Sequence, residues 1–166
     1  VECRASFEYF VHRFFNCIPG VGTLVWNWHL SLFCDELESL ARRVYRGEQK
    51  THDLVVNVPF GTTKSSIISI LFQCWVWSWW PEARFLCGTH TDSLALNLAQ
   101  RAKDVIESEL YRTCFPNVLI RTEVSAKEDY ANTVGGERKS CTVGGKTPMG
   151  RHSHFCILDD PLDPQG

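Results

Sequence analysis

A lysine and a serine follow a short turn in the first half of the chain, and this pair could bind phosphate. The turn, residues 59–63, reads PFGTT, and Lys64-Ser65 opens an apolar run behind it. Backbone N–H groups at the start of a helix attract anions. A lysine ammonium there reaches the β and γ phosphates of a nucleotide, and the following hydroxyl can ligate Mg²⁺. The order of turn, lysine and hydroxyl therefore indicates a phosphate-binding loop.

The glycine pattern of that loop differs from the strict one, GxxxxGK[ST]. Val58 and Thr63 occupy the two glycine positions, and Gly61 is the glycine that remains. A strand, a turn and a helix with a chance Lys-Ser are common in proteins. This segment alone therefore leaves an ordinary structural turn as the alternative to a phosphate site.

Two adjacent carboxylates, Asp159 and Asp160, follow an apolar run near the other end of the chain. The run reads FCIL and predicts a buried strand. Ligands of α/β sheets bind beyond the carboxyl ends of parallel strands. The first acid can hold Mg²⁺ there, and the second can polarise an attacking water. A surface turn before Pro161 is the alternative for this segment alone, whereas the two segments together favour a nucleoside triphosphate site.

Alternating strands and helices would position these residues. Short apolar runs that end at turns predict three strands, at 53–58, 84–88 and 154–158. Apolar residues at helical spacing predict three helices, at 29–46, 64–80 and 92–110. Gly47 would stop the first helix, Thr91 would cap the last, and a Gly135-Gly136 turn predicts a hairpin. This order predicts an α/β fold, with a parallel sheet and crossover helices.

Composition limits the classes of function. Apolar residues make up 44% and charged residues 22% of the 166 positions, which is typical of a folded protein. The net charge of −2 excludes binding to DNA by bulk positive charge alone. The longest apolar stretch, 67–80, is too short to span a bilayer, and its tryptophans predict core or interface packing rather than a nucleotide-stacking platform. The eight cysteines lack CxxC spacing, so buried reduced thiols are expected rather than a zinc site or a disulfide framework.

Several isolated polar residues have plainer interpretations. His90 follows the strand at 84–88 and is expected to be a polar turn residue rather than a substrate contact. His152 and His154 have a spacing that suits one strand face, and the lack of a third ligand nearby argues against a metal site. Four basic residues of the hairpin region could contact a DNA backbone, although a solvated face is the simpler interpretation: Lys127, Arg138, Lys139 and Lys146.

Five stretches of the chain carry a family resemblance when they are taken in order. They are Trp28-His29, LVVNVPFGTTKSS (54–66), RFLCGTHTDSLALNLAQRAKDVIES (84–108), TCFPN (113–117) and VGGERKSCTVGGKTPMGRHSHFCILDDP (134–161). This ordered set resembles the N-terminal ATPase region of a large terminase subunit, the DNA-packaging motor of tailed bacteriophages. The second stretch resembles the family's variant Walker A, and the last resembles a Gly-rich hairpin that leads to the Walker B strand.

The resemblance implies that ATP and Mg²⁺ bind at the loop. Lys64 would bind the β and γ phosphates, and Ser65 would ligate Mg²⁺. Loop N–H groups would come from three residues: Gly61, Thr62 and Thr63. His29 lies in a stretch that in the family is near the adenine, so it would be part of the nucleotide site.

The resemblance also assigns the acidic pair. Asp159 would be the Walker B acid that ligates the metal, and Asp160 stands where many members have a catalytic Glu that activates water. Many members carry an arginine in the loop, but Phe60 occupies that region here. The transition-state cation would then come from Arg151 or from a neighbouring subunit, with an ordinary loop charge as the alternative for Arg151.

The fold implied by the family is a P-loop NTPase-like parallel sheet of the additional-strand class, flanked by helices. Residues 1–50 would form a helical lead-in with the adenine-side region, and residues 51–166 would form the ATPase core. The chain begins with a valine and is expected to be an internal fragment, truncated after the Walker B strand. The family's ATP-coupling motif and its nuclease domain would lie beyond it.

The activity implied is ATP hydrolysis that powers the packaging of viral DNA into a procapsid. The partners would be double-stranded DNA, the portal protein and the small terminase subunit, and the packaging form would be a homo-oligomeric ring. The protein would work in the host cytoplasm, docked transiently on the procapsid and without a membrane. Two alternatives stay open: another P-loop motor such as a helicase, and a non-catalytic prophage remnant.

Overall fold

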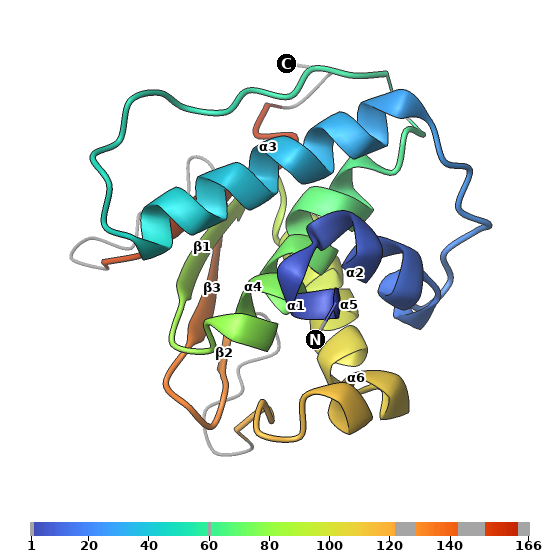
Figure 1. Cartoon of the computed structure of the whole chain (residues 1–166). Helices are drawn as coiled ribbons and strands as arrows, with labels where there is room; N and C mark the ends of the chain where they lie inside the picture. Colours follow the sequence, from blue (N-terminus) through green and yellow to red (C-terminus); the bar gives the residue numbers. More distant parts are fainter. Residues whose placement is uncertain (1, 60, 122–128, 143–151, 163–166) are drawn as a thin grey trace.

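The computed structural model describes residues 2–59, 61–121, 129–142 and 152–162. Figure 1 shows helices packed beside a small sheet, with one long helix running across the molecule. The helices are α1 Glu2–Ala5, α2 Phe7–Phe14, η1 Phe15–Cys17, α3 Trp28–Tyr45, η2 Ser66–Leu71, α4 Phe72–Trp79, α5 Asp92–Glu107 and α6 Glu109–Cys114. The strands are β1 Arg84–Thr89, β2 Tyr130–Ala131, β3 Glu137–Thr142 and β4 Phe155–Leu158.

The described part of the sheet has four strands in the order β2-β3-β1-β4. The central strand β1 pairs in parallel with β3 on one side and with β4 on the other. The short strand β2 pairs with β3 in the antiparallel direction, as the hairpin prediction requires. The chain is therefore a mixed α/β protein with a mostly parallel sheet flanked by helices.

Aromatic side chains join the helices to the sheet. Phe72 at the start of α4 contacts Phe85 of β1 and Phe155 of β4, with ring centroids 6.2 and 5.4 Å apart. Phe85 and Phe155 stack on each other across the strands at 4.9 Å. Trp75 and Trp77 of α4 are buried, which confirms that the tryptophan-rich segment packs in the core.

The ends of the predicted helices follow from local capping. The long helix α3 ends at Tyr45, and Gly47 follows its cap with a φ of 69°. Gly47 N donates to Val44 O and Glu48 N donates to Arg43 O, which is the hydrogen-bond pattern of a Schellman motif. Thr91 caps α5 through its hydroxyl, which accepts from Leu94 N at 3.3 Å. The helix predicted at 92–110 is broken in two because Ser108 ends α5 and caps α6.

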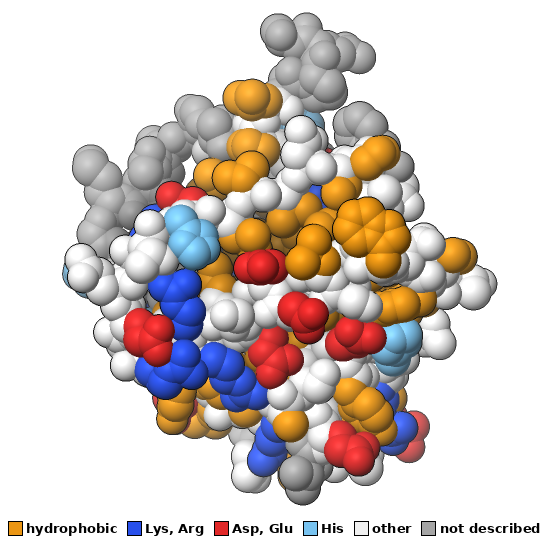
Figure 2. Space-filling model, turned by 45° about the horizontal axis from the view of Figure 1, so that its top comes forward, with side chains coloured by type: hydrophobic (Ala, Val, Ile, Leu, Met, Phe, Trp, Pro, Cys, Tyr) orange, Lys and Arg blue, Asp and Glu red, His pale blue; other side chains and the backbone are white. Residues whose placement is uncertain are grey.

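The face above α3 carries separated charges. Arg42 and Arg43 in the last turn of α3 suit the negative end of the helix dipole. Glu48 pairs with Arg43 and with Arg46, the C-cap residue that follows the helix. Figure 2 shows lysine and arginine side chains gathered on one side of this face, with acidic side chains beside them and hydrophobic ones beyond. These ion pairs are exposed, so they contribute little to stability.

The turn between β2 and β3 is built around Asn132. Its side-chain oxygen accepts from the backbone N–H groups of residues 134, 135 and 136, each at 2.9 Å. Its amide nitrogen donates to Pro81 O at 2.6 Å. A Cβ on Gly136 would lie 2.1 Å from that same carbonyl, so only glycine fits there. The predicted glycine turn is thus confirmed and is tied to the end of α4.

The strand predicted at 53–58 is wrong. The segment is extended, and Leu54, Val56 and Val58 face the core while Val55 is exposed, but it pairs with no strand of the described residues. The alternation of a strand is present, but the described residues contain no strand that pairs with it. A ladder needs a neighbouring backbone, and hydrophobicity does not specify one. Figure 1 shows the segment crossing above α3 instead.

No helix in the described part of the chain is long and apolar enough to cross a membrane. All eight cysteines are free thiols, which agrees with the predicted lack of a disulfide framework. Burial varies among them, because Cys34, Cys74 and Cys87 are buried while Cys156 is exposed on β4.

Candidate functional site

The turn that precedes Lys64 has an unusual backbone. Gly61 and Thr63 both have positive φ, at 80° and 59°. The Thr62 hydroxyl donates to Pro59 O at 2.8 Å and closes the turn. Helical conformation then begins at Lys64, with the first bond from Ile67 N to Thr63 O at 3.1 Å. The predicted turn-to-helix transition is present, although the strand before it is not.

The two acids follow β4 at the carboxyl end of the parallel strands. Asp159 continues the strand pairing through its N–H, which donates to Gly88 O at 2.9 Å. Asp160 leaves the strand with a φ of 45°. His90, which follows β1, donates from Nδ1 to the Asp160 carbonyl at 2.8 Å. The carbonyl can only accept, so this bond defines a tautomer of His90 with its proton on Nδ1.

An ion-pair cluster joins these two regions. Lys64 Nζ lies 2.7 Å from Asp160 Oδ1 and 3.6 Å from Asp159 Oδ1. The Asp159 side chain is 6% exposed, the Lys64 side chain 24% and the Asp160 side chain 41%. The hydrogen bond to Asp160 raises the pKa of the Lys64 ammonium, and the two carboxylate charges add to the effect against the opposing effect of burial. The lysine is therefore charged at neutral pH.

Backbone strain is concentrated around this cluster. Among the described residues, the non-glycine residues with positive φ are Thr63 and Asp160. One precedes Lys64 and the other is its closest partner. A left-handed conformation costs a β-branched or ordinary residue about 1–2 kcal/mol, and such costs gather where function needs them.

A buried serine that sequence reasoning missed contacts the first acid. Ser69 Oγ donates to Asp159 Oδ2 at 2.7 Å, and both residues are buried. The signal was available in the sequence, because Ser69 and Gln73 are polar residues four positions apart inside an apolar helix. This spacing puts them on one helix face, where a polar partner is required.

Arg138 corrects another expectation, since it is buried rather than part of a solvated basic face. It is 1% exposed, and its Nη1 donates to Gln73 Oε1 at 2.9 Å and to Ser69 O at 3.3 Å. The Tyr130 hydroxyl also donates to Gln73 Oε1, at 3.4 Å. A DNA-backbone contact through the Arg138 guanidinium does not fit this position.

The remaining predicted site residues have other surroundings. His29 lies in the first turn of α3, and its ring contacts are with Trp28 and Phe33 of the same helix, not with the Lys64 cluster. Ser65 is half-buried beside Lys64. Phe60 and Arg151 lie outside the described residues, as do Lys127 and Lys146.

The donor set around Lys64 suits a magnesium nucleotide. Mg²⁺ prefers oxygen ligands and is commonly bound by one or two carboxylates together with substrate phosphates. Asp159 would supply a carboxylate, and Ser65 would supply a hydroxyl nearby in the chain. In the described ranges no three His, Cys, Asp or Glu residues group into an all-protein metal site.

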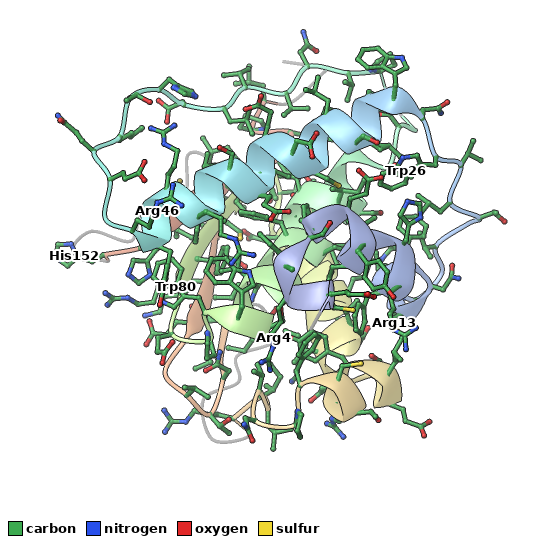
Figure 3. All side chains as sticks on the ribbon, in the orientation of Figure 1. Arg4, Arg13, Trp26, Arg46, Trp80 and His152 are labelled. Atoms are coloured by element: carbon green, nitrogen blue, oxygen red, sulfur yellow. The ribbon has the colours of Figure 1, made fainter. Side chains whose placement is uncertain are left out.

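A separate pocket lies at the opposite end of the sheet. Its volume is about 200 Å³, and its lining includes Arg84, Lys139 and His152. In Figure 3, His152 and Trp80 lie on the same side of the molecule as Arg46, at the end of α3. The pocket is therefore distinct from the Lys64 cluster.

Comparisons with family models, curated proteins and solved structures found no match to the chain. A proposal about function therefore depends on the residues and geometry described above and on the resemblance of the sequence motifs.

Proposed function

We propose that the chain binds ATP with Mg²⁺ at the turn before Lys64 and hydrolyses it. The observation that carries this proposal is the cluster in which Lys64 meets Asp160, 96 positions away, and Asp159 beside it. A lysine at the start of a helix and two carboxylates at the end of a neighbouring strand are the charged groups that phosphoryl transfer from a nucleotide requires. The strained backbone on both sides of the lysine supports the same conclusion.

The reaction follows from the charges. Phosphate oxygens of ATP replace Asp160 as the partner of Lys64, and the ammonium then stabilises charge on the β and γ phosphates. The Asp159 carboxylate and the Ser65 hydroxyl would hold Mg²⁺, which would supply further positive charge there. Asp160, released from the lysine, accepts a proton from water while the water oxygen attacks the γ phosphorus. The bond to the β,γ-bridging oxygen breaks, and ADP and phosphate leave.

The larger role we propose is that of the ATPase part of a large terminase subunit. Hydrolysis would drive double-stranded DNA into a procapsid, with the portal protein and the small terminase subunit as partners and a ring of this chain as the motor. The work would take place in the host cytoplasm. The ordered motif resemblance supports this role, and the Lys64 cluster supports only the ATPase step.

ATP hydrolysis by lysine variants tests the proposal. Lys64→Ala is expected to lower the hydrolysis rate by about 100-fold or more, since it removes a charge that stabilises the transition state. Lys50→Ala is the matched control, because Lys50 also forms a close ion pair, with Asp53 at 2.6 Å, but on the open surface. Equal rates for both variants and the wild type would overturn the assignment of the site.

Two other outcomes separate the alternatives. Tight ATP binding without turnover by the wild type would favour a non-catalytic remnant. Turnover that is stimulated by nucleic acid and coupled to strand separation would favour a helicase of the same sheet class. Turnover coupled to the uptake of duplex DNA by procapsids is the result expected for a packaging motor.

A further inference from the structure

Ser69 is a buried hydroxyl that bonds to the acid of the proposed metal site. Its Oγ donates to Asp159 Oδ2 at 2.7 Å, and the serine is 1% exposed. The other carboxylate oxygen, Asp159 Oδ1, is the one that faces Lys64, at 3.6 Å. The hydroxyl therefore occupies one oxygen of the carboxylate and leaves the other directed toward the lysine.

The local helix geometry gives Ser69 this orientation. Residues Ser66–Leu71 form a π-helical turn, in which Phe72 N bonds to Ile67 O, five residues back. Such widened turns shift the side chains that follow by a fraction of a turn and are frequent at functional sites. Here the turn interrupts an otherwise continuous helix directly after Lys64-Ser65 and contains Ser69. The π-helical turn thus lies between the proposed phosphate loop and the core.

The backbone of Ser69 is fixed from the other side. Arg138 Nη1 donates to Ser69 O at 3.3 Å and to Gln73 Oε1 at 2.9 Å. The hydroxyl of the serine is therefore bonded to the acid, and its carbonyl is bonded to a buried guanidinium. A buried residue held at both groups has little freedom to turn its hydroxyl away.

We propose that Ser69 is a positioning residue that orients the Asp159 carboxylate for Mg²⁺. The inference rests on the proposed function and adds a residue that the phosphate-loop pattern does not contain, since that pattern assigns a hydroxyl only to Ser65. Ser69 does not touch the nucleotide. It acts through Asp159, by holding Oδ2 so that Oδ1 points to the metal and the phosphates.

Residues that orient a metal ligand have a characteristic effect. Removing such a partner commonly lowers metal affinity by about 10- to 100-fold, while the ligand itself stays in place. Ser69→Ala should therefore raise the Mg²⁺ concentration needed for ATP binding and leave metal-free binding unchanged. A purely structural role would lower stability without changing the Mg²⁺ dependence.

The test is a Mg²⁺ titration of binding between the full chain and a fluorescent ATP analogue, with a parallel measurement in EDTA. Ser69→Ala is expected to raise the half-saturating Mg²⁺ concentration about 10-fold. Ser78→Ala is the matched control, because Ser78 is also buried in the same helical segment but donates to Trp75 O, away from the site. Ser69→Cys replaces the hydroxyl with a slightly larger and weaker donor, so its Mg²⁺ requirement should fall between those of Ser69→Ala and Ser78→Ala.

The outcomes are distinguishable. An unchanged Mg²⁺ requirement in folded Ser69→Ala or Ser69→Cys, equal to that of Ser78→Ala, would overturn the role of Ser69 and leave the proposed ATPase standing. Equal losses in the presence of Mg²⁺ and in EDTA would also overturn it, because they would indicate general damage to the site. Wild-type protein that binds the analogue without any Mg²⁺ dependence, or not at all, would overturn the proposed function and this inference with it.

Discussion

The two ends of the strands β1 and β4 have similar histidine bonds and very different charge networks. At the amino end, Arg84 N donates to His154 Nδ1 at 2.9 Å. At the carboxyl end, His90 Nδ1 donates to Asp160 O at 2.8 Å. Each histidine thus ties one strand to the segment beside the other strand. Among the described residues, the network of charges from distant parts of the chain lies at the carboxyl end.

The ion pairs at the two ends show the difference. At the amino end, Lys139 lies 3.4 Å from Glu137, two residues before it on β3, and both are partly exposed. At the carboxyl end, Lys64 bonds to Asp160 from 96 positions away, beside the buried Asp159. A local exposed pair is worth little, whereas a long-range, partly buried cluster costs desolvation and must be held by the fold.

Backbone strain also lies at the carboxyl end of the strands. The carboxyl end contains Thr63 and Asp160, both with positive φ, next to the lysine. Among the described residues, the costs of desolvation and strain gather at the carboxyl end of the sheet, which supports the proposed nucleotide site there. Three changes test that contrast, and they are ordered by the size of the expected effect.

The largest effect is expected from Asp160→Asn. The amide cannot accept a proton from water, so hydrolysis should fall by about 100-fold or more while ATP binding is retained. Steady-state ATPase assays and nucleotide-binding assays measure the two quantities. Glu137→Gln makes the same chemical change at the amino end and should leave hydrolysis unchanged. A wild-type hydrolysis rate in Asp160→Asn would contradict the assignment of Asp160 as the group that accepts the proton from water.

An intermediate effect is expected from relief of backbone strain. Thr63→Gly should raise the free energy of unfolding by about 1 kcal/mol, because glycine adopts a φ of 59° without steric cost. Thr142→Gly, in the strand β3, should lower it by a similar amount, about 0.5–1 kcal/mol. Urea unfolding measures both. If Thr63→Gly were destabilising, the turn before Lys64 would not be a store of strain.

The smallest effect is expected from mild acid at the amino end. Burial lowers the pKa of the His154 imidazole below its usual 6.5, and the charge of Arg84 adds to the shift. The unfolded chain therefore takes up the proton first, so the free energy of unfolding should fall as the pH drops from about 6.5 through the lowered pKa. His154→Asn keeps an acceptor and should lose this pH dependence. Unfolding curves between pH 8 and 5 measure this dependence. If His154→Asn showed the same pH dependence of the free energy of unfolding as the wild type, His154 would not be its source.

Many of the helices and strands around the site could be predicted from the sequence, because they depend on local signals. Apolar spacing and a stop at Gly47 predicted α3. The hydroxyl of Thr91 predicted the start of α5, and a short apolar run predicted β4. The contact of Lys64 with the acids after β4 was predicted from two parallel strands, at 53–58 and 154–158. The contact is present, but the first of these strands is not, so the rule accounts only for the position of the acids. These inferences need only one segment at a time, or one rule about sheets.

The predictions that failed concern features that depend on partners from elsewhere in the chain. The segment 53–58 has the alternation of a strand, but pairing requires a backbone beside it, which no local pattern reveals. Arg138 looked like a surface charge because its buried partners, Gln73 and the Ser69 carbonyl, are far away in the sequence. The bond between Ser69 and Asp159 was missed for the same reason.

Calorimetric titration of the full chain with ATP tests the central claim most directly. The Lys64 cluster predicts binding of one ATP per chain in Mg²⁺, a much weaker affinity in EDTA, and loss of binding in Lys64→Ala. The absence of binding by the folded wild-type chain at millimolar ATP and Mg²⁺ would contradict the account. Binding that is unchanged in Lys64→Ala would contradict it equally, because the nucleotide would then be held somewhere other than at this end of the sheet.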